Sequence, residues 1–237
     1  RIETLKMHRV AKGMRIASCL SDIEIFVVLY YSGLFNFCIE DHYRDRLIIS
    51  KAHGSLSLYS ILSDFGYFGK TQLTKVSQDG SILGIIPDCT IPGFDIVIGS
   101  LVVGLGVGCG LSIALKKKNI KSNVIVVSGD GELFEGSVWE AIMFAGHHRL
   151  DNLLLIVDKN KKCMLDYCEK VIDLEPLSKK FEVFNWAVKT VDDGNDVKKL
   201  YYASKELKQD KNHEPKVLIA NTVKGKGVPE LENDPQA

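Results

Sequence analysis

Two short apolar runs, separated by a segment of helix length, constrain the fold of this chain more than any other feature. Residues 124–127 and residues 153–157 are unbroken stretches of valine, isoleucine and leucine. Runs of this length and composition are typical of strands that are buried on both faces of a parallel sheet. The segment between them is long enough for the crossover helix that parallel neighbours require. The sequence therefore predicts an α/β fold with three layers, in which a parallel sheet is flanked by helices.

Polar residues follow both apolar runs, where the predicted strands should end. Asp130 stands between Gly129 and Gly131, and these glycines tolerate the backbone angles of a sharp turn. Asn160 lies just beyond the second run. Because neighbouring parallel strands end at the sheet edge where open α/β folds bind ligands, we expect Asp130 and Asn160 to lie close together. Their oxygen atoms suit Mg²⁺ or Ca²⁺ shared with a phosphate group.

The remaining apolar patterns place further elements around this unit. Ser137 and Glu140 have the spacing of a capping box, so a helix is expected to start at Ser137. Other helices are expected over residues 2–17, 20–31 and 196–208, and other strands over residues 47–49 and 216–220. We therefore expect one large α/β domain that covers residues 1–237.

Composition and charge argue against several classes of function. The chain has 237 residues, and its 30 basic and 30 acidic residues cancel, so no net charge favours nucleic acid or a membrane surface as partner. No apolar stretch reaches the length of a membrane span, and no signal peptide opens the sequence. The 6 cysteines lack C-x-x-C spacing and are interpreted as reduced thiols of a cytoplasmic protein. Cys163 and Cys168 could share a metal, but no second pair accompanies them, so free thiols are favoured.

The residues of the central stretch, taken in order, resemble those of a known family. A lone Asp-Gly pair would indicate only a turn, but GDGELFEGSVWEA followed by LDNLLLIVDKNK closely resembles the thiamine diphosphate motif of transketolases. The similarity is to their amino-terminal, diphosphate-binding part, especially in bacterial enzymes that are split into two polypeptides. It implies that the Asp130 side chain, the Asn160 side chain and the backbone oxygen of Lys162 hold a divalent metal. That metal would bridge the two phosphates of thiamine diphosphate.

The resemblance extends along the chain and implies further cofactor contacts. It carries a helical pattern through residues 63–78, a helix over residues 177–184 and a strand over residues 186–191. A histidine before a helix is commonly only structural, but RDRLIISKAHGS matches the family's RDRFILSKGHAS and favours a functional histidine here. The cofactor-binding residues that the resemblance implies are His53, Gly99, Ser100, Leu101, Gly131, Glu132, Asn160, Met164 and Lys224. Among these, residues 99–101 would contact the aminopyrimidine through their backbone.

Several positions depart from the family pattern. Arg15 and Ile86 stand where transketolases commonly place histidines that contact the substrate, and Val102 and Val103 replace a Gly-Gln or Gly-His pair. The first two changes put ordinary hydroxyl contacts to a ketose in doubt, and we leave open whether they alter specificity. The alternate glycines within residues 104–110 follow no clear strand and precede no obvious ribose ligand. They are therefore interpreted as helix-packing glycines and not as a dinucleotide site.

The leading hypothesis is the diphosphate-binding subunit of a split transketolase, which transfers a two-carbon ketol unit between sugar phosphates. The family resemblance implies that a second, carboxyl-terminal subunit supplies the pyrimidine domain and the glutamate that activates the cofactor, in an expected heterotetramer. One alternative is a specialised thiamine diphosphate carbon–carbon ligase or 2-oxoacid-processing enzyme in secondary or cell-surface sugar biosynthesis. The other is a non-catalytic scaffold relative.

Overall fold

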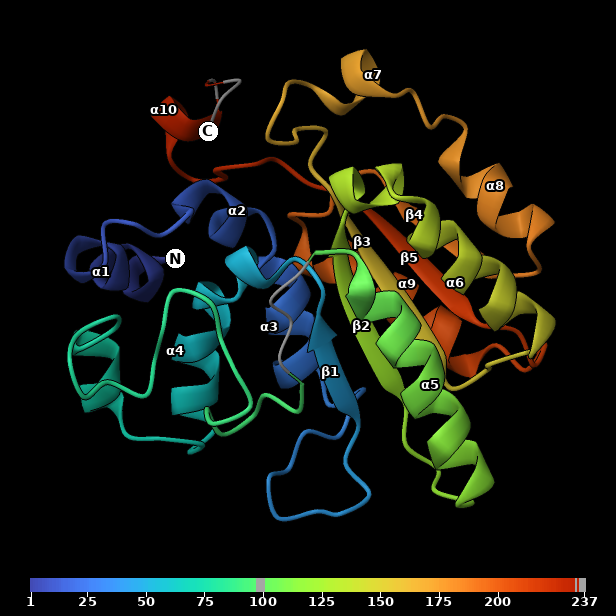
Figure 1. The fold of residues 1–237 in the computed structure, drawn as a ribbon, viewed down its shortest axis with the longest axis horizontal. Coiled ribbons are helices and arrows are strands. Elements are labelled where there is room, and N and C mark those ends of the chain that lie inside the picture. The colour runs from blue at the N-terminus through green and yellow to red at the C-terminus, as the bar shows by residue number, and fades with distance from the viewer. Residues whose placement is uncertain (97–100, 233, 235–237) are drawn as a thin grey trace.

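A parallel five-stranded sheet forms the centre of the part of the chain that the structure describes (Figure 1). The computed structural model describes residues 1–96, 101–232 and 234. The strands are β1 (Arg46–Ile49), β2 (Val124–Gly129), β3 (Leu153–Lys159), β4 (Ala187–Val191) and β5 (Lys216–Asn221). Their order in the sheet is β1-β2-β3-β5-β4, and all four pairings are parallel. The predicted parallel α/β architecture is confirmed.

Helices cover both faces of this sheet (Figure 1). The α-helices are α1 (Ile2–Val10), α2 (Ile16–Ser21), α3 (Ile23–Tyr31), α4 (Leu56–Asp64), α5 (Val103–Lys117), α6 (Gly136–His147), α7 (Cys168–Val171), α8 (Leu177–Val183), α9 (Val197–Gln209) and α10 (Pro229–Glu232). Three 3₁₀ helices complete the described elements: η1 (Ala52–Gly54), η2 (Lys70–Thr74) and η3 (Asp130–Phe134).

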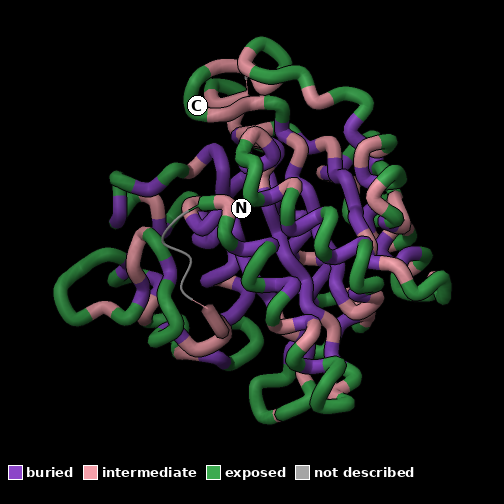
Figure 2. The backbone as a smooth tube through the Cα atoms, turned by 45° about the vertical axis from the view of Figure 1, so that its right-hand side comes forward, coloured by how far each residue is buried: buried purple, intermediate pink, exposed green. Residues whose placement is uncertain are grey.

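Successive side chains of β2 point to opposite faces of the sheet, and each face is covered by helices, which gives three layers. Ile125 and Val127 pack into a core with α3, α4 and α9, whereas Val124 and Val126 pack into a second core with α5, α6 and α8. All four side chains are fully buried, as expected of a central strand between two helical layers. Figure 2 shows the same arrangement, with buried backbone through the sheet and exposed backbone in the outer loops.

The amino-terminal helices differ from the prediction in where they break. The helix expected over residues 2–17 ends at Val10, and the chain restarts as α2 at Ile16. The helix expected over residues 20–31 begins at Ile23, because Asp22 separates α2 from α3. Asp22 is fully buried and forms an ion pair with Lys51, a tertiary partner that no local apolar period reveals.

Two further boundaries were predicted wrongly. The helical pattern through residues 63–78 is not continuous, since α4 ends at Asp64 and only η2 is helical after it. Gly66 adopts a φ of +81°, which stops the helix there. The helix expected to start at Ser137 starts at Gly136 with Glu135 as its N-cap, and no side chain caps it. In the part of the chain that is described, no helix has both the length and the apolar character needed to cross a membrane.

Candidate cofactor site

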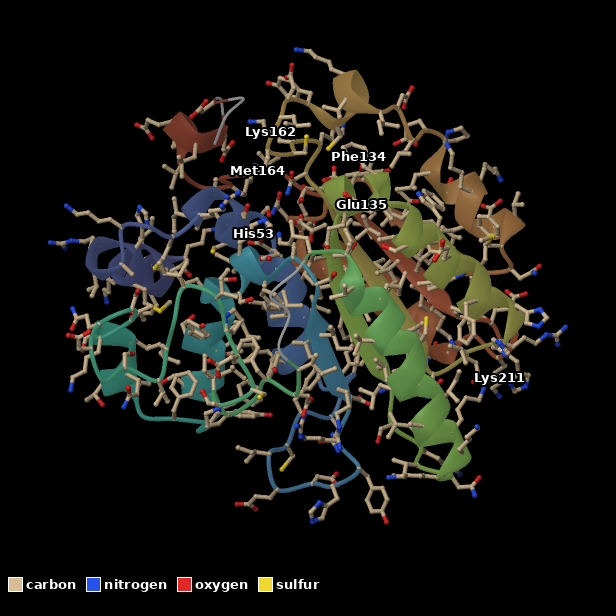
Figure 3. All side chains as sticks on the ribbon, viewed as in Figure 1. His53, Phe134, Glu135, Lys162, Met164 and Lys211 are labelled. Atoms are coloured by element: carbon tan, nitrogen blue, oxygen red, sulfur yellow. The ribbon has the colours of Figure 1, made fainter. Side chains whose placement is uncertain are left out.

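A cavity of about 630 Å³ lies at the carboxyl ends of β2 and β3. The predicted site residues that line it are His53, Leu101, Asp130, Gly131, Glu132, Asn160, Lys162, Met164 and Lys224. Gly99 and Ser100 lie outside the described residues. Figure 3 shows His53, Lys162 and Met164 in this region, whereas Lys211 lies away from them, at the lower right of the view, and lines a smaller cavity of about 320 Å³.

Asp130 is held rigidly at the cavity by backbone amides. The turn after β2 runs directly into η3, so the side chain sits where the strand ends and is only 6% exposed. Its Oδ1 accepts a hydrogen bond from the amide of Gly131 at 3.0 Å, and its Oδ2 accepts one from the amide of Lys161 at 2.7 Å. Burial, together with the nearby charge of Asp158, raises the pKa of Asp130 to about 6. A cation at this carboxylate would offset that penalty, so the donor set fits a metal.

Asn160 has its side-chain amide oriented by two different partners. Its Nδ2 lies 3.3 Å from Oδ2 of Asp158, and its Oδ1 accepts a hydrogen bond from the amide of Lys162 at 3.1 Å. This network assigns the oxygen of Asn160 to the loop side, away from the buried carboxylate. A carbonyl oxygen has two lone pairs, so Oδ1 keeps one for a cation. The structure thus brings Asp130, which follows β2, to the same cavity as Asn160 and Lys162, which follow β3.

A buried charge cluster beneath Asn160 was not predicted from the sequence. Lys51 follows β1, and its ammonium lies 3.0 Å from Oδ2 of Asp22 and also pairs with Asp158. All three side chains are at most 3% exposed. Burial raises the pKa of Asp22 to about 7, whereas Lys51 and its hydrogen bond outweigh burial at Asp158 and lower the pKa of that carboxyl. The sequence signal for this cluster was a charged residue near the carboxyl end of two buried strands, namely Lys51 after β1 and Asp158 in β3.

The imidazole of His53 and the ammonium of Lys224 belong to residues that line the same cavity. Burial and the positive charges of Lys51, Arg15 and Lys224 lower the pKa of His53 to about 3, so the imidazole is neutral near pH 7. Burial and the charges of Lys51 and Lys162 also lower the pKa of Lys224. Its ammonium has no hydrogen-bond or ion-pair partner among the described residues. An anion placed here would satisfy both the charge and the donors of Lys224.

Comparison with known proteins identifies the family. The family model described as "Transketolase, thiamine diphosphate binding domain" matches residues 7–237. The chain belongs to the transketolase family. The matching part of a transketolase binds thiamine diphosphate, as the resemblance implied.

Relatives of two lengths share this transketolase domain. The chain is 37% identical over 227 residues to a subunit of the apulose-4-phosphate transketolase of Actinobacillus succinogenes, covering 94% of this chain and 81% of the relative. It is 34% identical over 235 residues to a 6-deoxy-6-sulfo-D-fructose transketolase subunit of Clostridium sp., covering 96% and 84%. The crystal structure of transketolase from Campylobacter jejuni is similar with a TM-score of 0.88 and 27% identity, covering 99% of this chain but 39% of that one.

Glu132 lines the cavity and also anchors the backbone around it. Its carboxylate is buried and accepts hydrogen bonds from Ser50 Oγ at 2.5 Å and from the amides of Val102 and Gly129, both at 2.8 Å. Val102 has a φ of 75°, a conformation that is costly for a β-branched residue. Glu132 therefore holds the entry to α5 in place.

The two residues that stand in place of family histidines lie in different parts of the structure. Arg15 lines the cavity and its guanidinium contacts the thioether of Met164. Ile86 is 45% exposed and does not line this cavity. Of the two replacements, only Arg15 therefore alters the described cavity of this transketolase domain.

Proposed function

We propose that this chain is the diphosphate-binding subunit of a two-subunit transketolase that transfers a two-carbon ketol unit between sugar phosphates. One observation carries the proposal. Asp130 and Asn160, which come from neighbouring strands, present oxygen atoms at one cavity that also holds the ammonium of Lys224, which has no partner within the described ranges. A pair of oxygen ligands beside such a cation matches the needs of a divalent metal bound to a diphosphate.

In this proposal the chain's own residues hold the cofactor by its charged end. Asp130, the side-chain oxygen of Asn160 and the backbone oxygen of Lys162 would bind Mg²⁺, with Ca²⁺ as a substitute. Lys224 would neutralise the diphosphate. The neutral imidazole of His53 would donate or accept one hydrogen bond beside it, without adding charge.

The cofactor's rings would lie further along the same cavity. We propose that residues 99–101 contact the aminopyrimidine and that Gly131 and Met164 contact the cofactor nearby. Glu132 supports this wall through its bonds to Val102 and Gly129. When bound, thiamine diphosphate supplies the electron sink for breaking and forming carbon–carbon bonds.

A partner subunit belongs to the proposal. The two bacterial relatives described above are each named as a transketolase subunit, which supports a second polypeptide that supplies the pyrimidine domain. We propose that the two subunits form a heterotetramer with the cofactor between them. A cytoplasmic location is also proposed, supported by 6 cysteines that are all free.

The test is a calorimetric titration of thiamine diphosphate and Mg²⁺ into the chain together with its partner subunit. Asp130→Asn and Asn160→Ala are each expected to weaken binding by more than about 100-fold, beyond the loss typical of residues that only support a metal ligand. Asp192→Asn is the control, since Asp192 is exposed and does not line the cavity. Folding of each variant is checked by circular dichroism. Undiminished affinity in both site variants would refute the metal assignment.

A second candidate function is supported by Arg15. A thiamine diphosphate enzyme that acts on an acidic substrate would benefit from a fixed cation in the cavity, and Arg15 is placed there. Mixing the two subunits and measuring carbon–carbon transfer from neutral and acidic donors would separate the two candidates.

A further inference from the structure

We propose that Arg15 is a specificity-determining residue, whose guanidinium pairs with an oxyanion of the substrate. The inference rests on the proposed function, because it assigns a substrate feature to the same cavity. It adds a recognition element that does not act on the cofactor.

Arg15 is an exposed residue at the start of α2, where it is the N-cap. It lines the cavity, and its guanidinium contacts Met164 on the loop after β3. A thioether is a weak hydrogen-bond acceptor, whereas a guanidinium has five N–H donors. Within the described ranges, neither an oxygen acceptor nor a carboxylate is paired with Arg15. Its donors are therefore available to a ligand.

The other cations of the cavity are already committed. Lys51 is paired with two buried carboxylates. The ammonium of Lys162 donates to the carbonyl oxygens of Glu232 at 3.0 Å and Asp234 at 2.8 Å. Lys224 is the cation that we assign to the diphosphate. Arg15 is the cavity cation that these assignments leave over.

The acidic groups of the cavity do not neutralise Arg15 either. The carboxylate of Glu132 already accepts hydrogen bonds from Ser50 and from two backbone amides. Asp130 is held by the amides of Gly131 and Lys161 and is assigned to the metal. Glu135 also lines the cavity, but it has no ion pair with Arg15 among the residues described.

The surroundings of Arg15 favour an anion over a hydroxyl group. Met14 and Ala17 are buried apolar neighbours in the same wall, and the exposed side chains of Met164 and Leu165 also line the cavity. These side chains offer sugar hydroxyls no acceptor stronger than a thioether, whereas a hydrogen bond from the guanidinium to an oxyanion is about twice as strong as one between neutral groups. The charge of Arg15 also contributes to the lowered pKa of His53, which indicates that its field reaches into the cavity.

The planar guanidinium matches any oxyanion that presents two oxygens side by side. A substrate of the proposed reaction offers this chemistry at two places. One is a carboxylate next to the reacting carbonyl, as in a 2-oxo acid, and the other is a phosphate at the far end of a sugar. Three donors that share one ketol head distinguish the two sources: 3-hydroxypyruvate, xylulose 5-phosphate and the neutral ketose erythrulose.

Donor binding is measured by calorimetry on the two-subunit complex that contains Mg²⁺ and a thiamine diphosphate analogue unable to react, so the readout does not require turnover. Arg15→Met is expected to lower the preference for the recognised anionic donor over erythrulose by at least about tenfold, as loss of a charged hydrogen bond predicts. Arg15→Lys keeps the positive charge but not the planar guanidinium with its paired donors, so the complex should lose part of its preference for the anionic donor over erythrulose. Arg9→Met, on the exposed face of α1 outside the cavity, should leave the preference unchanged.

Each result has a defined meaning. A loss confined to 3-hydroxypyruvate assigns Arg15 to a carboxylate, and a loss confined to xylulose 5-phosphate assigns it to a phosphate. Equal preferences in the wild type and Arg15→Met, with the analogue bound by both, would overturn the role of Arg15. Weaker binding of the analogue itself by Arg15→Met would also overturn it, because the residue would then serve the diphosphate. A wild-type complex that binds no analogue would instead refute the proposed function.

Discussion

Replacing Lys51 by methionine is expected to remove a large share of the protein's stability. The ammonium of Lys51 contacts Asp22 Oδ2 at 3.0 Å, the carbonyl of Ser18 at 3.2 Å and Ser21 Oγ at 3.3 Å, and it also pairs with Asp158. Both carboxylates are 0% exposed. Removing one partner from a buried ion pair costs about 3–5 kcal/mol, because the remaining charge is left uncompensated. A domain has about 5–15 kcal/mol of unfolding free energy in total.

The carboxylates of Asp22 and Asp158 differ in the hydrogen bonds that they retain without Lys51. Asp158 still accepts hydrogen bonds from Ser21 and Thr222, whereas Asp22 keeps only Ser57 at 3.1 Å within the described ranges. The double variant Lys51→Met with Asp22→Asn should therefore recover roughly 1–3 kcal/mol, the cost of an unsatisfied buried group.

The pH dependence gives a second signature. The pKa of Asp22 is raised to about 7 by burial even with Lys51 present, against an ordinary value of 3.8. Because Lys51 lowers this pKa, the pKa of Asp22 should be higher still in Lys51→Met. Between pH 8 and pH 6 the folded variant should therefore bind more protons than the unfolded chain, so its unfolding free energy should rise as the pH falls. The double variant should lack this rise because it has no carboxyl at residue 22.

Urea unfolding, followed by far-ultraviolet circular dichroism at pH 8 and pH 6, measures these differences. A loss below roughly 1 kcal/mol at pH 8 in Lys51→Met would contradict the reasoning, since it falls short of the cost of an uncompensated buried charge. Equal slopes with pH in the single and double variants would show that Asp22 is not the group that titrates.

Two further predictions concern single residues. A Cβ at Gly146 would lie 1.9 Å from the carbonyl oxygen of Phe184, so Gly146→Ala should lower the free energy of unfolding in urea by about 1–3 kcal/mol. A Cβ at Gly106 would meet no described atom within 4 Å outside its own stretch of helix, so Gly106→Ala should raise the free energy of unfolding by roughly 0.5–1 kcal/mol. The opposite order would refute the packing argument. The pKa of His53 is lowered from 6.5 to about 3, so the unfolded chain takes up a proton below pH 6.5 that the folded protein excludes, and stability should fall towards pH 4.5. His53→Gln should lessen that fall by roughly 2 kcal/mol, and an unchanged pH profile would exclude His53 as its source.

The sequence predicted the central sheet because burial on both faces leaves a strong pattern. The apolar runs around Val126 and Leu155 correspond to β2 and β3, and their parallel pairing follows from the crossover helix between them. The convergence of Asp130 and Asn160 follows from the same rule, since parallel neighbours end at one edge. Their placement at one cavity needed no further information.

The failed boundaries depended on partners that are distant in sequence. The break between α2 and α3 occurs at Asp22, which pairs with Lys51 and accepts a hydrogen bond from Ser57. The start of α6 was predicted at Ser137 without the preceding η3, because a 3₁₀ turn after β2 leaves no apolar period in the sequence. Lys51 itself was overlooked, since a lysine after a strand is normally exposed and only the folded sheet shows that it is buried.

Lys162 joins the cavity to the segment around α10. Its ammonium holds the carbonyls of Glu232 and Asp234, while its backbone oxygen is a proposed metal ligand. Occupancy of the metal site and docking of that segment therefore depend on one residue, so each should stabilise the other by the same free energy. The amide hydrogens of α10 should then exchange with deuterium more slowly in the loaded protein, and a protease that trims this segment should release the cofactor faster.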